Sequence, residues 1–165
     1  MFRILLITSL LTLLIGAWQP ARATDYFTLG LGYFDVLDQE DEAAQFGLEY
    51  RGEYVWGGLR PAIGINVTTD NAVYGYVGGY YDWFFYDKLY VSPNFMVGAY
   101  AQGDGKDLGH ALEFRSGLEL GYEFSDAQRA SVAFNHISNA SIGEKNPGAE
   151  TLLFNYSVPL GGLFK

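Results

Sequence analysis

The sequence predicts an all-β protein that forms an eight-stranded antiparallel transmembrane β-barrel of the up-and-down type. Three observations favour this fold. The chain of 165 residues is rich in Gly (21 residues) and in aromatic residues (17%), which is typical of many short strands. Apolar and polar residues alternate along about eight segments, as half-buried strands require. The connections between these segments are alternately short and long.

The first 23 residues have the pattern of a secretory signal peptide. Arg3 supplies a basic start, residues 4–17 are apolar, and Ala21-Arg22-Ala23 matches an A-x-A cleavage site. The apolar run is shorter than the roughly 20 residues that a spanning helix needs. We therefore expect export and cleavage after Ala23, with residues 24–165 forming a single outer-membrane barrel domain.

Composition argues against several classes of function. The chain has no Cys, so it can form neither a disulfide nor a thiolate metal site. Its formal net charge is -9, which argues against a nucleic-acid partner because phosphate binding needs clustered Lys and Arg. This acidity is typical of solvated loops.

Two segments show the strand alternation most clearly, and in each the apolar and polar residues take opposite faces. In residues 43–54, one face carries Phe46, Leu48, Tyr50 and Tyr54, and the other carries Gln45, Glu49, Arg51 and Glu53. In residues 109–124, one face carries Leu112, Phe114, Leu118, Leu120, Tyr122 and Phe124, and the other carries Glu113, Arg115, Glu119 and Glu123.

The remaining strands are predicted with the same two-residue period. They span residues 25–37, 57–69, 72–83, 88–102, 128–139 and 150–160. Lengths of about 11–15 residues are long for a soluble sheet but suit a tilted membrane strand. Pro61 and Pro93 fall inside two of these strands, so each is expected to mark a bulge or an end.

The connections indicate which way the barrel is oriented. Short turns are expected near residues 55–56, 84–87 and 125–127, and longer loops at residues 38–42, 103–108 and 140–149. In outer-membrane barrels the short turns face the periplasm. We therefore expect the longer loops to lie on the outside of the cell.

The direction of the apolar face separates a membrane barrel from a soluble, lipocalin-like one, whose apolar face points inward. Here the polar faces combine Glu with Arg and contain little Lys, which favours paired charges inside a narrow barrel over a solvated exterior. Aromatic residues near strand ends are expected to form an interfacial girdle. They are Trp56, Trp83, Phe84, Phe85 and Tyr86.

One window, FNHISNASIGEKNPGAE at residues 134–150, carries groups able to do nucleophilic chemistry. By alternation, His136, Ser138 and Glu150 fall on the lipid-facing side of two neighbouring strands, where polar groups are expensive unless they have a use. Opposed side chains of neighbouring strands lie within about 5 Å. Ser138 as nucleophile, His136 as base and Glu150 as orienting acid would thus form a triad.

The tetrahedral oxyanion of such a triad would need N–H donors. The candidates in this window are Asn139, Asn146 and the backbone amides of residues 140–147. Each residue also has an ordinary structural interpretation, since Asn-Pro-Gly is first of all a turn signal. His110 is interpreted as structural. Lys145 is either a solvated cation or a contact for a lipid phosphate.

The segments H-I-S-N-A and N-P-G-A-E together resemble the signature of the PagL family, the outer-membrane lipid A 3-O-deacylases. Outside this window the similarity is limited to strand pattern and length. The resemblance implies an eight-stranded barrel that hydrolyses the ester-linked 3-hydroxyacyl chain at position 3 of lipid A, in the outer leaflet. It also implies a Ser–His–Glu triad, here Ser138, His136 and Glu150, with no metal and no cofactor.

The resemblance further implies an oxyanion hole. Its side-chain donor would be Asn146, and its backbone donor would be the N–H of Ser141, a position that is often Gly in the family. Asn139 would be a supporting residue.

Two other functions stay open at the level of sequence: an outer-membrane phospholipase or acyltransferase, and a non-enzymatic structural or adhesion barrel with acidic outer loops. The expected partners are the membrane and lipid A or lipopolysaccharide, and a homodimer stays open.

Overall fold

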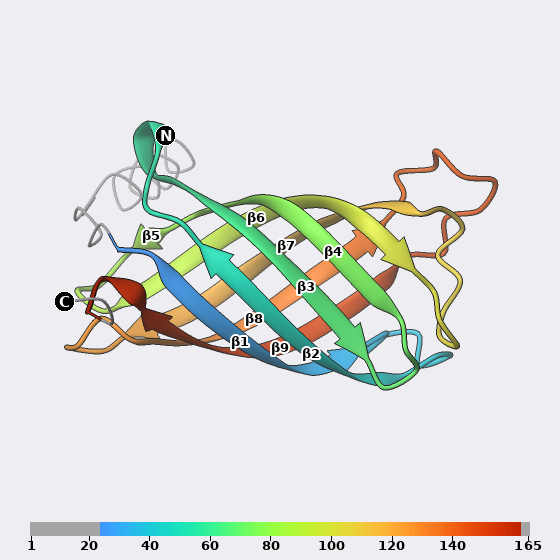
Figure 1. The fold of residues 1–165 in the computed structure, drawn as a ribbon, viewed down its shortest axis with the longest axis horizontal. Helices are drawn as coiled ribbons and strands as arrows, with labels where there is room; N and C mark the ends of the chain where they lie inside the picture. The colour runs from blue at the N-terminus through green and yellow to red at the C-terminus, as the bar shows by residue number, and fades with distance from the viewer. Residues whose placement is uncertain (1–23, 163–165) are drawn as a thin grey trace, which may run out of the picture.

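Eight long strands form a closed antiparallel barrel in the computed structural model, which describes residues 24–162 (Figure 1). The strands are β1 Tyr26–Phe34, β2 Ala43–Arg51, β3 Leu59–Thr68, β4 Val73–Tyr81, β6 Leu89–Ala101, β7 Leu112–Glu123, β8 Arg129–Ser138 and β9 Ala149–Pro159. A two-residue strand, β5 (Trp83–Phe84), continues β4 along β6. The pairing of β1 with β9 closes the barrel, which confirms the predicted fold class.

Short helical segments and the chain ends complete the description. The 3-10 turns η1 (Trp56–Gly58) and η2 (Leu160–Gly162) lie next to β3 and β9. None of the helical segments among residues 24–162 has the length and apolar character of a membrane-spanning helix. The predicted signal peptide at residues 1–23 lies outside the described residues.

The apolar face of the strands points outward, as expected for a membrane barrel. On β2, Phe46 and Leu48 are exposed, whereas Glu49 and Arg51 are buried. On β7, Leu118 and Leu120 are exposed, and the acidic and basic residues between the apolar ones are buried. An exposed apolar wall around a charged interior is stable only when lipid surrounds the wall. The outer wall of this barrel is therefore a lipid-facing surface.

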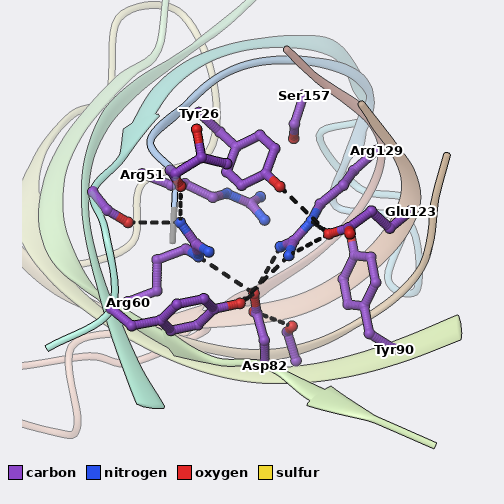
Figure 2. A network of polar contacts seen from close by, with 12 residues as sticks. Tyr26, Arg51, Arg60, Asp82, Tyr90, Glu123, Arg129 and Ser157 are labelled. Atoms are coloured by element: carbon purple, nitrogen blue, oxygen red, sulfur yellow. Dashed lines mark hydrogen bonds and ion pairs between the residues drawn. The ribbon is translucent and has the colours of Figure 1, made fainter. Parts of the chain in front are cut away.

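Buried ion pairs fill the interior. The Arg51 guanidinium donates to both carboxylate oxygens of Glu119 at 2.8 Å, and its Nε donates to Glu49 at 2.5 Å. Figure 2 shows a second centre nearer the short-turn end, where Arg60 and Arg129 both point at Asp82. In these ion pairs each buried charge meets an opposite charge, which offsets the cost of removing it from water. Glu113 is also fully buried, but neither of its carboxylate oxygens has a hydrogen-bond partner among the described residues.

Three predictions of the direction in which a side chain points need correction. β2 ends at Arg51, so Tyr54 does not continue the lipid-facing row; its hydroxyl donates to Asp82 at 2.6 Å inside the barrel. Glu53 is exposed in the same connection and is not part of the interior ion pairs. Phe84 was expected in the aromatic girdle but is buried and lies against the Tyr90 ring. For Tyr54 and Glu53 the physical cause is local: once a strand stops pairing, its two-residue alternation no longer applies. Phe84 instead follows the alternation of β4 and β5, in which Tyr80 and Phe84 both point inward.

The other predicted girdle residues differ in exposure. Trp56 is 91% exposed, Phe85 and Tyr86 are also exposed, and Trp83 is half-buried. Neither proline disturbs the register. Pro61 lies where the β2–β3 ladder ends, and Pro93 lies opposite the gap between β4 and β5, so each sits where a missing N–H costs no ladder hydrogen bond.

The two ends of the barrel differ in their connections (Figure 1). The turns at residues 85–88 and 124–128 are short, as predicted, but β2 and β3 are joined by residues 52–58, a longer connection than the turn predicted near residues 55–56. β1 begins beside the end of β9, with Tyr26 opposite Pro159, at the short-turn end. At the opposite end, residues 35–42, 102–111 and 139–148 form the longer loops. These loops contact one another. Lys106, which is buried, donates to Asp35 at 2.7 Å, and Asn139 donates to the Leu108 carbonyl at 2.8 Å.

Candidate active site

The register of β8 and β9 places His136 directly opposite Glu150. Nδ1 of His136 and Oε1 of Glu150 are 2.8 Å apart, a hydrogen bond between side chains on the outward face. The His136 side chain is 47% exposed and that of Glu150 is 19% exposed. Because Glu150 engages Nδ1, the other ring nitrogen, Nε2, is the one left to accept a proton.

Ser138 follows His136 on the same strand face and is partly buried. Two residues along a strand span about 6.6 Å, so the serine lies one step nearer the loop end than the imidazole. Its partner on β7 is Phe114. Within residues 24–162, the side-chain hydrogen bonds of His136 include the one to Glu150 but none to the Ser138 hydroxyl. The hydrogen bond between the base and the nucleophile of a triad commonly shortens only when substrate is bound.

Gly148 packs directly against the imidazole, a contact that the sequence did not predict. Its φ is +68°, and a Cβ added there would lie 2.9 Å from Cε1 of His136. The position therefore requires glycine for two reasons, the backbone conformation and the space. The only signal in the sequence was the Asn-Pro-Gly segment, which by itself indicates a turn.

The chain turns sharply immediately after Ser138 and Asn139. Ala140 and Ser141 have φ of 54° and 63°, and the Ile142 N–H donates to the Asn139 carbonyl at 3.1 Å. These features are those of a type I′ turn, whose two central positions favour Gly, Asn or Asp. Ser141 thus adopts a left-handed backbone conformation that glycine favours. No described residue accepts a hydrogen bond from the N–H of Ala140 or Ser141, so both donors are available beside Ser138.

Two asparagines hold this turn. The Asn139 N–H donates to Oδ1 of Asn146 at 2.9 Å, which fixes the Asn146 amide with its NH₂ group on the Ser141 side; Nδ2 lies 3.4 Å from the Ser141 hydroxyl oxygen. Asn139 is fully buried, and its own NH₂ group donates to the carbonyls of Leu108 and Lys145, both at 2.8 Å. The amide NH₂ of Asn146 and the N–H of Ser141 are thereby brought to one turn.

The remaining predicted residues of this region have local partners. Lys145 forms an exposed ion pair with Asp107 at 2.7 Å. The hydrogen bond from Lys145, together with one from the Gly109 N–H, holds the pKa of Asp107 below its usual range. His110 accepts a hydrogen bond from the Leu112 N–H at 2.9 Å, a local contact that fits the structural role predicted for it.

Polar side chains are rare on the lipid-facing wall. Apart from tyrosines, the outward-facing positions of the eight long strands within residues 24–162 carry four polar side chains. They are Ser116, His136, Ser138 and Glu150. All four lie on the adjacent strands β7, β8 and β9. The sequence reasoning named three of them and missed Ser116. Within residues 24–162, no group of three or more His, Asp or Glu side chains could hold a metal ion.

Comparisons with known proteins agree with this architecture. In structure, the chain is similar to the "Crystal structure of the outer membrane enzyme PagL", with a TM-score of 0.63, 19% identity, and coverage of 82% of this chain and 99% of that one. It is also similar to a structure described as "De novo design of transmembrane beta-barrels", with a TM-score of 0.56, 13% identity, and coverage of 85% and 99%. At these identities the two structures support the fold alone.

The sequence comparisons identify the family. The search of curated proteins finds no match, and nothing in the comparisons supports a homodimer. The model of the family described as "Lipid A 3-O-deacylase (PagL)" matches residues 25–159, almost the whole of the described chain. The protein therefore belongs to the PagL family of outer-membrane lipid A 3-O-deacylases.

Proposed function

We propose that this protein is an esterase that hydrolyses the 3-O-linked 3-hydroxyacyl chain of lipid A with the triad Ser138, His136 and Glu150. The observation that carries the proposal is the 2.8 Å hydrogen bond between His136 and Glu150 on the outward face of the barrel, one step along β8 from Ser138. A carboxylate that engages Nδ1 holds the imidazole in the tautomer whose Nε2 can accept a proton from a serine.

In the first half of the reaction, the Ser138 hydroxyl attacks the ester carbonyl carbon while Nε2 of His136 takes the hydroxyl proton. The tetrahedral intermediate then collapses, the bond to the 3-oxygen of the sugar breaks, and His136 returns the proton to that oxygen. In the second half, His136 removes a proton from water, the hydroxide attacks the acyl-enzyme, and the 3-hydroxy fatty acid leaves as Ser138 is reprotonated. Glu150 stays ionised and stabilises the imidazolium in both halves.

The oxyanion of each tetrahedral intermediate would be held by the NH₂ group of Asn146 and the N–H of Ser141. The Asn146 amide is suited to donation because its oxygen is already occupied by the Asn139 N–H. Asn139 supports both donors by fastening the loop to residues 108 and 145. Donors that are fixed in place before the reaction stabilise developing charge without further reorganisation.

The substrate would enter sideways from the outer leaflet. The triad lies on the lipid-facing wall at the end with the longer loops, where lipid A acyl chains meet their sugar headgroup. The apolar wall below Ser138 would receive the chain, and the loops would face the sugar. Export by a signal peptide at residues 1–23, cleaved after Ala23, would deliver the protein to this membrane.

The test is mass spectrometry of lipid A and phospholipids from cells that express the wild type or the Ser138→Ala variant. We expect the wild type to remove one 3-hydroxyacyl chain from lipid A, and Ser138→Ala to remove none while still folding as a heat-resistant barrel. Ser125→Ala, a serine replacement in the short turn at the far end, should act as the wild type does. Undiminished chain release by Ser138→Ala would disprove the mechanism. Loss or gain of a chain on phospholipids instead would indicate a phospholipase or an acyltransferase.

A further inference from the structure

Ser116 is a polar residue on the lipid-facing wall that the proposed triad does not use. It lies on β7, is exposed, and is paired in register with His136. Glu150 pairs with His136 from the other side. The three side chains therefore form one row across β9, β8 and β7, with the imidazole between the carboxylate and the Ser116 hydroxyl.

The surroundings of Ser116 give no structural reason for a hydroxyl. Its partner on β6 is Phe95, and its neighbours on the same face of β7 are Phe114 and Leu118. The rings of Phe95 and Phe114 stack with centroids 6.1 Å apart. No described residue forms a hydrogen bond with the Ser116 side chain. An aliphatic residue would suit this position in lipid better, so the small polar side chain requires an explanation beyond packing.

The spacing of Ser116 and Ser138 matches the chemistry of a 3-hydroxyacyl ester. Ser138 is diagonal to Ser116 across the β7–β8 pair, and diagonal side chains lie about 7–8 Å apart. A reacting carbonyl carbon lies about 3 Å from its nucleophile. The 3-hydroxyl oxygen is three covalent bonds farther along the chain, about 3–4 Å. It can therefore lie up to about 6–7 Å from the Ser138 oxygen, which brings it within hydrogen-bonding distance of Ser116.

The direction of the chain is also consistent. Ser138 lies at the loop end of β8, and His136 and Ser116 lie one step deeper along the wall. An acyl chain attached at Ser138 must run in that direction to reach the membrane interior. Beyond Ser116, the next outward residues, Leu118 and Phe134, are apolar, as the hydrocarbon part of the chain requires. Apart from tyrosines, Ser116 is thus the last polar side chain that the chain passes on the described wall.

We propose that Ser116 is a specificity-determining residue whose hydroxyl hydrogen-bonds the 3-hydroxyl of the acyl chain to be removed. The inference rests on the proposed deacylase function and deepens it. The protein would distinguish 3-hydroxyacyl from unsubstituted acyl esters through a hydroxyl on the barrel wall beside the catalytic base.

The test uses the full barrel purified in detergent and two synthetic glucosamine 3-O-esters that differ only in the presence of the 3-hydroxyl on the acyl chain. The variants are Ser116→Ala, which removes the hydroxyl, and Ser116→Thr, which keeps one. Leu48→Ala on β2 is the control for a lipid-facing change away from the proposed path of the chain. We expect Ser116→Ala to lower kcat/KM for the hydroxylated ester by about threefold to tenfold, the effect of one neutral hydrogen bond. The rate for the unsubstituted ester should not change, and Ser116→Thr should restore the preference.

Equal effects of Ser116→Ala on both esters, with the wild type active and Ser138→Ala inactive, would overturn this inference and leave the deacylase function intact. Abolished activity in Ser116→Ala with activity retained in Ser138→Ala would also overturn it, because Ser116 would then be the nucleophile. A wild type that hydrolyses neither ester would overturn the proposed function and this inference with it.

Discussion

Replacing Gly148 by Ala tests how closely the imidazole is held in place. Gly148 has φ +68°, and the new Cβ would lie 2.9 Å from Cε1 of His136. Because real Cβ atoms essentially never approach other heavy atoms to less than 3.0 Å, either the ring or the loop must move. The ring is held on its other side by the 2.8 Å hydrogen bond from Nδ1 to Glu150. Moving it therefore lengthens that hydrogen bond or rotates Nε2 away from Ser138.

The expected magnitude has two parts. The left-handed conformation costs an alanine about 1–2 kcal/mol of stability. Reaching an ordinary contact requires a displacement of some tenths of an ångström, and a misplacement of about 1 Å can cost on the order of 10²-fold in rate. We therefore expect the deacylation rate of Gly148→Ala to fall by about tenfold to 100-fold, with a modest loss of thermal stability.

The assay is release of 3-hydroxy fatty acid from lipid A by purified protein, measured beside the thermal unfolding of the barrel. Gly57 provides a matched control. Its φ is +71° and a Cβ added there would meet nothing within 4 Å, so Gly57→Ala carries the same conformational cost without the contact to His136. Equal activity of the two alanine variants would refute the reasoning, because the effect would then owe nothing to the position of the imidazole.

Three further predictions concern the loops around the site. Asn146→Asp keeps the oxygen that accepts a hydrogen bond from the Asn139 N–H but removes the NH₂ donor. The deacylation rate should fall by about 10²–10³-fold, while limited proteolysis should show an intact loop. A rate close to that of the wild type would exclude Asn146 as an oxyanion donor. Ser141→Gly relieves the strain of the left-handed backbone conformation at φ 63° and retains the backbone N–H. Thermal unfolding should show a stability gain of up to about 1 kcal/mol, and the deacylation activity should be retained. Loss of activity would mean that the Ser141 hydroxyl is needed. The lowered pKa of Asp107 means that its ion pair with Lys145 contributes fully above the ordinary Asp pKa of about 4 and is lost as the pH falls through the lowered value. The protection of residues 139–148 against hydrogen exchange, measured relative to the intrinsic exchange rate at each pH, should therefore fall in acid in the wild type. An equal fall in Asp107→Asn would contradict this role.

The strand pattern was predictable because it is a local property. Side chains of a strand alternate between its faces whatever the strand pairs with, so Phe46 and Leu48 could be assigned to one side, and Glu49 and Arg51 to the other, before any partner strand was known. The presence of Arg and Glu on the same face indicated a filled, charged interior. The prediction failed at Tyr54, which lies beyond the end of β2, where alternation no longer constrains the side chain. It failed at Phe84 because this aromatic residue was assigned to the girdle from its place near a strand end, whereas the alternation continues through β5 and turns Phe84 inward.

The site was predictable only in part. The resemblance in residues 134–150 named Ser138, His136 and Glu150, and alternation alone assigned all three to the outer wall. The turn after Ser138 was less predictable. Ala140 and Ser141 adopt left-handed conformations that their residue types disfavour, and the hydrogen bonds that hold this turn come from residues several positions away, including Asn146.

The sequence alone thus determined the barrel, the direction of its apolar face and the three residues of the candidate triad, because period and motif depend on neighbours along the chain. Tertiary structure decided which side chains meet across strands. The register of β8 against β9 places His136 opposite Glu150, and that of β7 against β8 places Ser116 beside the same imidazole. Register depends on loop lengths and on closure of the whole barrel, since a slip of one residue would turn every side chain of a strand to the other face.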